Sequence, residues 1–355
     1  MDKAFSLIER LKNENNLTKA ETAWLIDNIQ DEHRSALYRY ALETKQAHYG
    51  NKVFMRGLIE FSNICKQNCN YCGIRGANSN VERYRLTKDQ ILECCREGRR
   101  LGYSTFVLQS AEDAHYSEQV MVDIISSIKQ EFPDCAITLS IGERPFHEYE
   151  SMRKAGADRY LLRHETASKE LYEKLHPGMS FENRIKCLFD LKELGYQVGA
   201  GFMVGLPGQT AVHLAEDLHF LKELNPHMIG IGPFIPHSET PLAEEKGGTL
   251  EQTLLMVALA RLFVPKALLP ATTALGTLDK TGREKALNAG ANVVMPNLTP
   301  TVQRAKYQLY QNKICIGDEA AHCRNCIEKR INSAGFEVDM GRGDSCNMGT
   351  AQCVV

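Results

Sequence analysis

Hydrophobic positions change their spacing at regular intervals between about residue 53 and residue 295. Short apolar runs, typical of buried strands, alternate with longer stretches in which apolar residues recur every three or four positions, as on amphipathic helices. Glycine follows several of these helical stretches, where helix C-caps belong. We predict strands at 57–61, 105–109, 136–140, 159–162, 197–203, 228–231, 268–272 and 292–295, with helices near 88–101, 118–131, 146–154, 181–194, 212–224, 250–264 and 283–289.

Eight strands that alternate with helices over about 250 residues indicate an α/β protein with a complete (β/α)8 TIM barrel. A doubly wound open sheet is the alternative. We expect an N-terminal helical extension (1–50) that braces or plugs the barrel bottom, the barrel (51–310), and a C-terminal tail (311–355). In such barrels, functional side chains gather just after the C-terminal ends of the strands.

Composition narrows the class of protein. A hydrophobic share of 43% and a charged share of 24% are ordinary for a globular protein. The formal net charge of −2 offers no electrostatic case for a nucleic-acid partner. No apolar run is long enough to span a bilayer, and the first residues do not open a signal peptide, so we expect a cytoplasmic protein without a membrane partner. Twelve cysteines in such a chain indicate metal ligands or buried thiols and not disulfides.

Three cysteines follow the first predicted strand in the pattern Cys65-x3-Cys69-x2-Cys72. This spacing lets one loop wrap three thiolates around an iron–sulfur cube. Because a cubane has four irons, three cysteines leave one iron open for another ligand. A zinc knuckle or three unrelated thiols are the alternatives, but zinc requires a fourth nearby Cys or His, and none lies between Asn63 and Glu82.

The second predicted strand ends in Gln109-Ser110-Ala111-Glu112. Small residues let a ligand approach the backbone closely, and Glu112 can accept hydrogen bonds from an ammonium group. An acidic turn after a strand is nevertheless common, so this motif is weak by itself.

The fourth predicted strand ends in Arg163-His164-Glu165. Ionisable residues at a barrel mouth are costly unless they are paired or used. Arg163 could clamp a carboxylate, and Glu165 could hold hydroxyls or an amine, with Arg184 in the next helix as a further candidate. A salt-bridge cluster that closes the barrel top is the structural alternative.

Later strands add a glycine-rich turn that includes Gly205, a stiff apolar segment at 230–237 suited to a dry cavity, and a group of hydroxyl and basic side chains. Hydroxyls and guanidinium groups could hold an anionic substrate, although threonines are also simply good strand formers. The candidates in this group are Thr272, Thr273, Thr138, Arg159 and Arg56.

A second cysteine group, Cys315-x7-Cys323-x2-Cys326, lies in the tail. Three cysteines again indicate an iron–sulfur site, with His322 as an uncertain fourth donor. Zinc and unligated thiols remain alternatives. The Gly-rich polar segment that contains Cys346 and Cys353 has the composition of a mobile tail, and we assign it no role.

From about Phe54 to Cys326 the chain resembles the HydE family of [FeFe]-hydrogenase maturases, a radical S-adenosylmethionine (SAM) branch related to biotin synthase and methylornithine synthase. The resemblance rests on both cysteine groups and on segments 109–113, 160–166, 205–210 and 230–237. Ala111 departs from the family, where glycine is more typical before the glutamate, and its methyl could tighten the backbone contact with SAM.

The resemblance implies that Cys65, Cys69 and Cys72 hold a [4Fe-4S] cluster whose open iron binds SAM. Reductive cleavage of SAM would give a 5′-deoxyadenosyl radical that acts on an iron–cysteine carbonyl/cyanide precursor of the diiron subcluster. A second cluster, [2Fe-2S] or [4Fe-4S], would sit on Cys315, Cys323 and Cys326. The implied SAM contacts are Tyr71, Gln109, Ser110, Glu112, Arg163, Glu165, Arg184 and Gly205, and the implied substrate contacts are Arg56, Thr138, Arg159, Met228, Thr272, Thr273, Met295, Tyr307 and Tyr310.

The same resemblance implies a monomer that receives electrons from flavodoxin or ferredoxin and works with other hydrogenase maturases. A biotin synthase-like or methylornithine synthase-like enzyme with an amino-acid-derived substrate is the nearest alternative. It would need a sacrificial cluster in the barrel or groups for an amino-acid zwitterion. A non-enzymatic iron–sulfur carrier would need both cysteine groups but no SAM contacts, and the Arg163/Glu165 pair argues against it.

Overall fold

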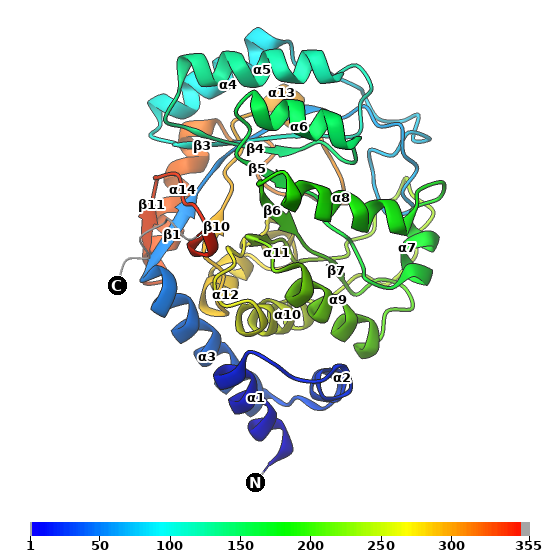
Figure 1. Ribbon diagram of the computed structural model, residues 1–355, viewed down its shortest axis with the longest axis vertical. Helices are drawn as coiled ribbons and strands as arrows, with labels where there is room; N and C mark the ends of the chain where they lie inside the picture. The colour runs from blue at the N-terminus through cyan, green and yellow to red at the C-terminus, as the bar shows by residue number, and fades with distance from the viewer. Residues whose placement is uncertain (1, 349–355) are drawn as a thin grey trace.

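A closed ring of parallel strands forms the centre of the computed structural model, which describes residues 2–348 (Figure 1). Six strands pair in the order β2-β3-β4-β5-β6-β8, and parallel bridges Met228↔Leu268, Pro270↔Val293 and Leu58↔Asn297 complete the ring. The predicted (β/α)8 barrel is therefore confirmed, with its seventh position at 268–270 present only as bridges. The strands are β1 (Lys52–Met55), β2 (Gly57–Ser62), β3 (Thr105–Ser110), β4 (Ala136–Ser140), β5 (Arg159–Leu161), β6 (Gln197–Ala200), β7 (Met203–Val204), β8 (Met228–Ile229), β9 (Gly232–Pro233), β10 (Val293–Val294) and β11 (Glu337–Asp339).

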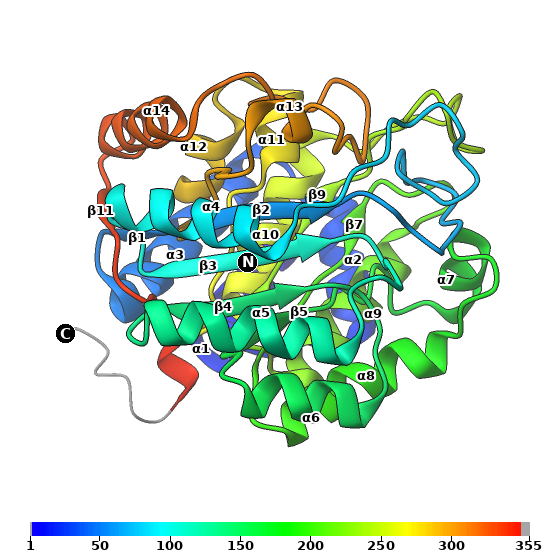
Figure 2. The ribbon, with the colours of Figure 1, turned by 90° about the horizontal axis from the view of Figure 1, so that it is seen from above.

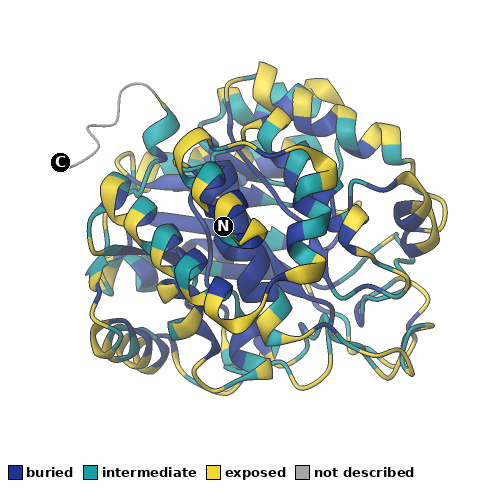
Figure 3. Cartoon of the chain, turned by 90° about the horizontal axis from the view of Figure 1, so that it is seen from below, coloured by how far each residue is buried: buried dark blue, intermediate teal, exposed yellow. Residues whose placement is uncertain are grey.

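Helices cover the outside of the ring, with their exposed faces outward and their buried faces against the strands (Figure 3). Several begin at a Ser or Thr whose hydroxyl accepts a backbone N–H, as Thr87, Ser180 and Thr249 do. The barrel helices are α4 (Lys88–Arg100), α5 (Glu118–Glu131), α6 (Phe146–Lys154), α7 (Lys169–Leu175), α8 (Phe181–Glu193), α9 (Ala211–Leu224), α10 (Leu250–Phe263), α11 (Thr273–Leu278), α12 (Gly282–Asn288), α13 (Thr301–Arg304), α14 (Ala320–Ser333) and the 3-10 turn Cys346–Met348.

Three N-terminal helices pack against one flank of the barrel: α1 (Lys3–Glu14), α2 (Lys19–Asn28) and α3 (Asp31–Tyr49). Their main neighbours are α9 and α10, and Asn15 ties them there because its Nδ2 donates to Leu262 O at 2.9 Å. These helices brace the flank, and Tyr49 at the end of α3 reaches the barrel floor, where its Oη donates to Lys266 O at 2.5 Å. Among the described residues, no helix is both long and apolar enough to cross a bilayer.

The bottom of the barrel is closed by residues 337–346, which lie far from the barrel strands in sequence. Strand β11 pairs in parallel with β1, which in turn pairs with β10, and Figure 2 shows β11 beside β1 below α14. The Asp344 carboxylate accepts from Arg159 Nη2 at 2.5 Å and from Gln197 Nε2 at 2.6 Å. Gly343 O accepts from Arg56 Nη2 at 3.0 Å.

The expectation of a mobile tail is thus wrong for the residues up to 348. Two buried guanidinium groups need acceptors, and the polar backbone and carboxylate of this segment supply them. Cys353 lies outside the described residues.

Replacing Asp344 by asparagine should lower the free energy of unfolding by about 2 kcal/mol at neutral pH, since buried Arg159 loses its counter-charge. Burial alone would raise the pKa of Asp344, but the charge of Arg159 outweighs it and holds that pKa well below its usual range. A carboxyl with a lowered folded-state pKa stabilises the protein above its unfolded pKa of about 4, and the benefit fades below that pH.

Urea unfolding at neutral pH and near pH 3 measures this difference. The gap between native protein and Asp344→Asn should narrow in acid, and an equal gap at both pH values would contradict the assignment. Asp123→Asn, which removes an exposed partner of Lys88, is the control and should change stability by less than about 1 kcal/mol.

Candidate functional site

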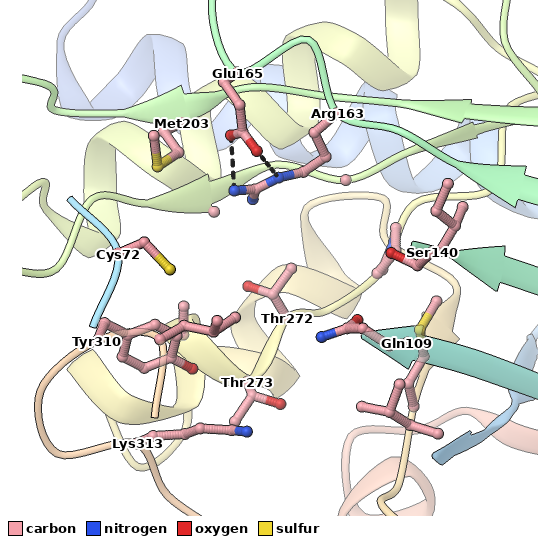
Figure 4. Close-up of a pocket in the computed structure, with 18 of the residues that line it drawn as sticks. Cys72, Gln109, Ser140, Arg163, Glu165, Met203, Thr272, Thr273, Tyr310 and Lys313 are labelled. Carbon is pink, nitrogen blue, oxygen red and sulfur yellow. Dashed lines mark hydrogen bonds and ion pairs between the residues drawn. The ribbon is translucent and has the colours of Figure 1, made fainter. Parts of the chain in front are cut away.

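A cavity of about 420 Å³ opens at the C-terminal ends of the barrel strands. Side chains from the loop after β2, from the ends of β3 to β9 and from residues 270–313 form its wall, and Figure 4 shows them converging on one space. This is the end of a parallel barrel at which ligand sites are found.

The cysteine loop lies over this cavity and is held by backbone hydrogen bonds. Lys66 N–H donates to Glu112 O at 3.0 Å, Asn70 N–H to Leu175 O at 2.8 Å, and Gly73 N–H to Leu309 O at 2.8 Å. A Cβ on Gly73 would stand 2.4 Å from Gln308 O and 2.5 Å from the His237 ring. Glycine is therefore required directly after the third cysteine, because the loop packs tightly against the chain at this point.

The three thiols of this loop are half-buried and near enough to one another that their charges interact. Burial raises the pKa of Cys65 and of Cys69, and it raises the pKa of Cys72 to about 12. Thiols in such a place become thiolates when a metal centre binds them. No three His, Cys, Asp or Glu side chains of residues 2–348 converge as ligands of a single ion, whereas each thiolate of a cubane binds its own iron. The donor set fits the cluster.

Arg163 and Glu165 form an ion pair at the cavity wall. Arg163 Nη2 lies 2.8 Å from Glu165 Oε2, and its Nε donates to Oε1 at 3.2 Å, as Figure 4 shows. Arg184 is buried behind them, where its Nη1 donates to Arg163 O and its Nε to Glu143 Oε1, both at 2.6 Å. The three residues predicted from the sequence are thus together and already oriented.

Other predicted SAM contacts divide into two groups. Tyr71, Gln109 and Ser110 line the cavity, and Tyr71 Oη lies 3.1 Å from His176 Nε2. Glu112 does not line it, because its two carboxylate oxygens accept from Gln67 Nε2 at 2.7 Å and from the backbone of the segment after β4 at 3.1 Å. The structure makes Glu112 a brace of the cysteine loop.

Gly205 also lies off the cavity wall. Its φ of 83° and the nearby Gly248 backbone, 2.2 Å from where a Cβ would stand, require glycine at this position. The Gly205 N–H donates to Gln209 Oε1 at 2.7 Å and so closes the turn.

Six of the nine predicted substrate contacts line the cavity. Thr272 Oγ1 is buried and has no hydrogen-bond partner among the described residues, so it is available to a ligand. Burial raises the pKa of Tyr310 to about 12, which keeps its hydroxyl a donor at neutral pH. The six are Met228, Thr272, Thr273, Met295, Tyr307 and Tyr310.

The other three predicted substrate contacts are not brought to the cavity. Arg159 is the first residue of β5 and Arg56 directly precedes β2, so both lie at the bottom of the barrel, where they bind the 342–344 segment. Thr138 is buried on β4, and its Oγ1 has no partner among the described residues. Their position along the strand, and not their chemistry, separates them from the site.

Four polar or charged side chains line the cavity without having been predicted from the sequence: Glu60, Ser140, Arg283 and Lys313. Lys313 Nζ lies 2.6 Å from Glu60 Oε1 and donates to Tyr307 O at 2.8 Å, and both charged side chains are almost fully buried. A charged residue inside the apolar run 57–62 was a signal for Glu60. Nothing in the local pattern pointed to Lys313 or Arg283.

The tail cysteines lie just behind this wall. The thiols of Cys315 and Cys323 are near enough to influence each other's ionisation, and Arg283 Nη2 lies 3.6 Å from Cys315 Sγ. The Cys323 thiol and the Arg283 guanidinium lower the pKa of Cys315. Cys326 is exposed three residues further along α14, whereas His322 is exposed with its Nε2 3.9 Å from Asp318.

Comparison with known proteins identifies the class first. Residues 59–221 match the model of the Radical SAM superfamily, and with the cysteine loop above the cavity they define a radical SAM enzyme. The [FeFe] hydrogenase maturase subunit HydE of Thermotoga maritima is 52% identical over 300 residues, 84% of this chain and 86% of that protein. The chain belongs to the HydE family.

Two further similar proteins are named for a different activity, the synthesis of methylornithine. The 3-methylornithine synthase of Methanosarcina acetivorans is 33% identical over 315 residues, 88% of each chain. The crystal structure of methylornithine synthase (PylB) superposes with a TM-score of 0.83 at 28% identity, over 94% of this chain and 97% of that one. The PylB structure shares the barrel.

Proposed function

We propose that this protein is a hydrogenase maturase that uses SAM to act on an iron–cysteine carbonyl/cyanide precursor of the diiron subcluster. The 52% identity to the Thermotoga maritima maturase, over most of both chains, is the observation that carries the proposal. The cavity supports it, because its wall pairs cationic groups with donors that an anionic iron complex would need.

In this proposal Cys65, Cys69 and Cys72 hold the [4Fe-4S] cluster. When bound and reduced, the cluster supplies the electron that cleaves SAM into methionine and the 5′-deoxyadenosyl radical. Arg163 and Glu165 would orient the charged methionine end of SAM, and Arg184 fixes the Arg163 backbone through its 2.6 Å hydrogen bond.

The precursor would lie deeper in the cavity, against Thr272, Thr273 and Tyr310. The wall carries four cationic side chains, Arg163, Arg184, Arg283 and Lys313, but only two carboxylates, Glu60 and Glu165. This excess favours an anionic substrate. Met228, Met295 and Tyr307 add the apolar surface that shields a radical from water.

We also propose a monomer reduced by flavodoxin or ferredoxin, which passes its product to other maturases. The cytoplasmic location stays a prediction from the sequence.

The test is anaerobic reconstitution with iron and sulfide, followed by dithionite reduction with SAM and assay for 5′-deoxyadenosine. A synthetic iron–cysteine dicarbonyl cyanide complex should accelerate product formation and be consumed, whereas lysine, an isomer of 3-methylornithine, should not. Consumption of lysine in place of the iron complex would favour a methylornithine synthase-like enzyme. A properly reduced cluster that never cleaves SAM would favour an iron–sulfur carrier.

We expect Cys323→Ala to remove the iron of the second cluster, in the tail, and to leave 5′-deoxyadenosine formation largely intact. Cys323 and Cys315 lie near each other behind the cavity wall, and neither lines the cavity. Iron and sulfide analysis with the SAM-cleavage assay checks this, and Cys187→Ala, at a buried thiol in α8, is the control that should retain all iron. Loss of SAM cleavage with the iron would make the tail site an electron-transfer or catalytic element.

A further inference from the structure

Glu165 has a backbone conformation that residues other than glycine rarely adopt. Its φ is +67°, and Thr166 N–H donates to His164 O at 2.9 Å, which closes a three-residue turn centred on Glu165. Such a turn is strained and persists only where its surroundings hold it. The turn aims the Glu165 carboxylate into the cavity beside Arg163 (Figure 4).

Neighbouring strands hold the turn on its cavity side. Glu165 N–H donates to Gly201 O and Met203 N–H donates to Glu165 O, both at 3.0 Å. These bonds fix the peptide groups of Glu165, but they do not explain what holds the residues on either side of it.

One buried carboxylate contacts both flanks. Asp217, on α9, is fully buried, and its Oδ1 accepts from Ala167 N–H at 2.5 Å. His164 Nε2 lies 3.3 Å from the same oxygen. Because His164 Nδ1 accepts from Gly201 N–H at 3.3 Å, the ring proton belongs on Nε2. This Nε2 packs against Asp217 without forming a hydrogen bond among the described residues.

Burial disfavours a charge on either side chain of this pair. It lowers the pKa of His164 to about 3 and raises that of Asp217 well above its usual range. The contact that Asp217 makes with the turn is an acceptor oxygen at a fixed place. Its other oxygen, Oδ2, has no hydrogen-bond partner among the described residues.

We propose that Asp217 is a positioning residue for SAM binding: through Ala167 and His164 it holds the strained turn that presents the Glu165 carboxylate to the cavity. This inference rests on the proposed function, in which Glu165 binds SAM. It assigns a functional role to a side chain that does not line the cavity.

The experiment measures the Kd for SAM by calorimetry on the cluster-reconstituted protein, at a temperature at which circular dichroism shows every variant folded. Asp217→Leu removes the acceptor at similar size and should raise the Kd about tenfold, the affinity equivalent of the strain it would release. Asp217→Asn retains Oδ1 and should stay within about twofold of the native protein, since it keeps both contacts. Tyr196→Phe, which removes a buried hydrogen bond to Tyr149 O, is the control that should lower thermal stability without changing the Kd.

Glycine at position 165 adopts a positive φ without strain, so Asp217→Leu should change the Kd of a Glu165→Gly protein by less than about twofold. If Asp217→Leu does not fold, His164→Phe tests the other arm, because it keeps a ring but neither nitrogen, and it should also raise the Kd.

The outcomes separate the inference from the proposed function. A raised Kd in Glu165→Gln with a native Kd in Asp217→Leu would overturn the inference alone. An equal loss in Asp217→Asn and Asp217→Leu would also overturn it, because the acceptor oxygen would then not be what matters. A native Kd in Glu165→Gln would overturn the role of Glu165 in SAM binding, and the inference with it.

Discussion

Replacing Cys69 by alanine is expected to reduce 5′-deoxyadenosine formation to the level seen without protein. With only three cysteines to hold four irons, the loop has no spare ligand, and alanine leaves two. Cys69 is half-buried and lies near the other two thiols, Arg184 and Glu165, and none of these other groups is a spare thiolate.

Iron content, the spectrum of the reconstituted cluster and the cleavage assay together check this expectation. Cys95→Ala is the matched control, because Cys95 is a buried thiol packed in α4 and should not affect the cluster. Since burial raises the pKa of the loop thiols, cluster assembly must release protons, and iron uptake should increase with pH. Retained SAM cleavage in the alanine variant would refute the assignment of the cysteine loop.

Replacing Lys313 by methionine should destabilise the protein by about 3–5 kcal/mol, because it leaves the Glu60 carboxylate buried without its counter-charge. The ion pair is 2.6 Å long, and its side chains are only 8% and 2% exposed. Asn297 Nδ2, at 2.7 Å from Glu60 Oε2, remains as a donor but carries no charge.

The double variant Glu60→Gln/Lys313→Met should recover most of the loss, since two neutral groups of similar size can replace a buried pair at little cost. Urea unfolding of the cluster-free protein measures all three variants. Lys66→Met, which removes a 3.7 Å contact to Glu112 from a lysine that is 60% exposed, is the control and should cost less than about 1 kcal/mol. A double variant no more stable than Lys313→Met would show that packing, and not charge, makes Lys313 necessary.

The contrast between Arg159 and Arg163 shows how far the sequence could predict the site. Both stand in one short apolar segment, and both were natural ligands for an anion. Residue type and spacing correctly placed Arg163 and Glu165 after the strand, where a barrel collects functional groups. Arg159 is the first residue of β5 and therefore lies at the opposite end of the barrel from the cavity. The sequence could not show this, because local propensity places the boundary of an element only to within a few residues.

Long-range partners explain the remaining differences. By its composition the segment 341–346 reads as a mobile tail. It is ordered because it binds Arg56 and Arg159, which lie far away in the sequence. Lys313 enters the cavity only because the chain returns over the barrel mouth after residue 300. The alternation of strands and helices is local and was predictable, whereas these contacts depend on how distant segments meet.

The closure of the barrel floor also has a consequence for biosynthesis. Strand β11 and the Asp344 segment emerge from the ribosome after every barrel strand has been made, yet β1 can gain its second neighbour only from them. Until then Arg56 and Arg159 face an open floor without the backbone oxygen and the carboxylate that this segment supplies. Contacts between such distant segments form slowly. The newly made barrel should therefore pass through a late stage in which it is sensitive to proteases and accessible to chaperones, until the C-terminal segment closes its floor.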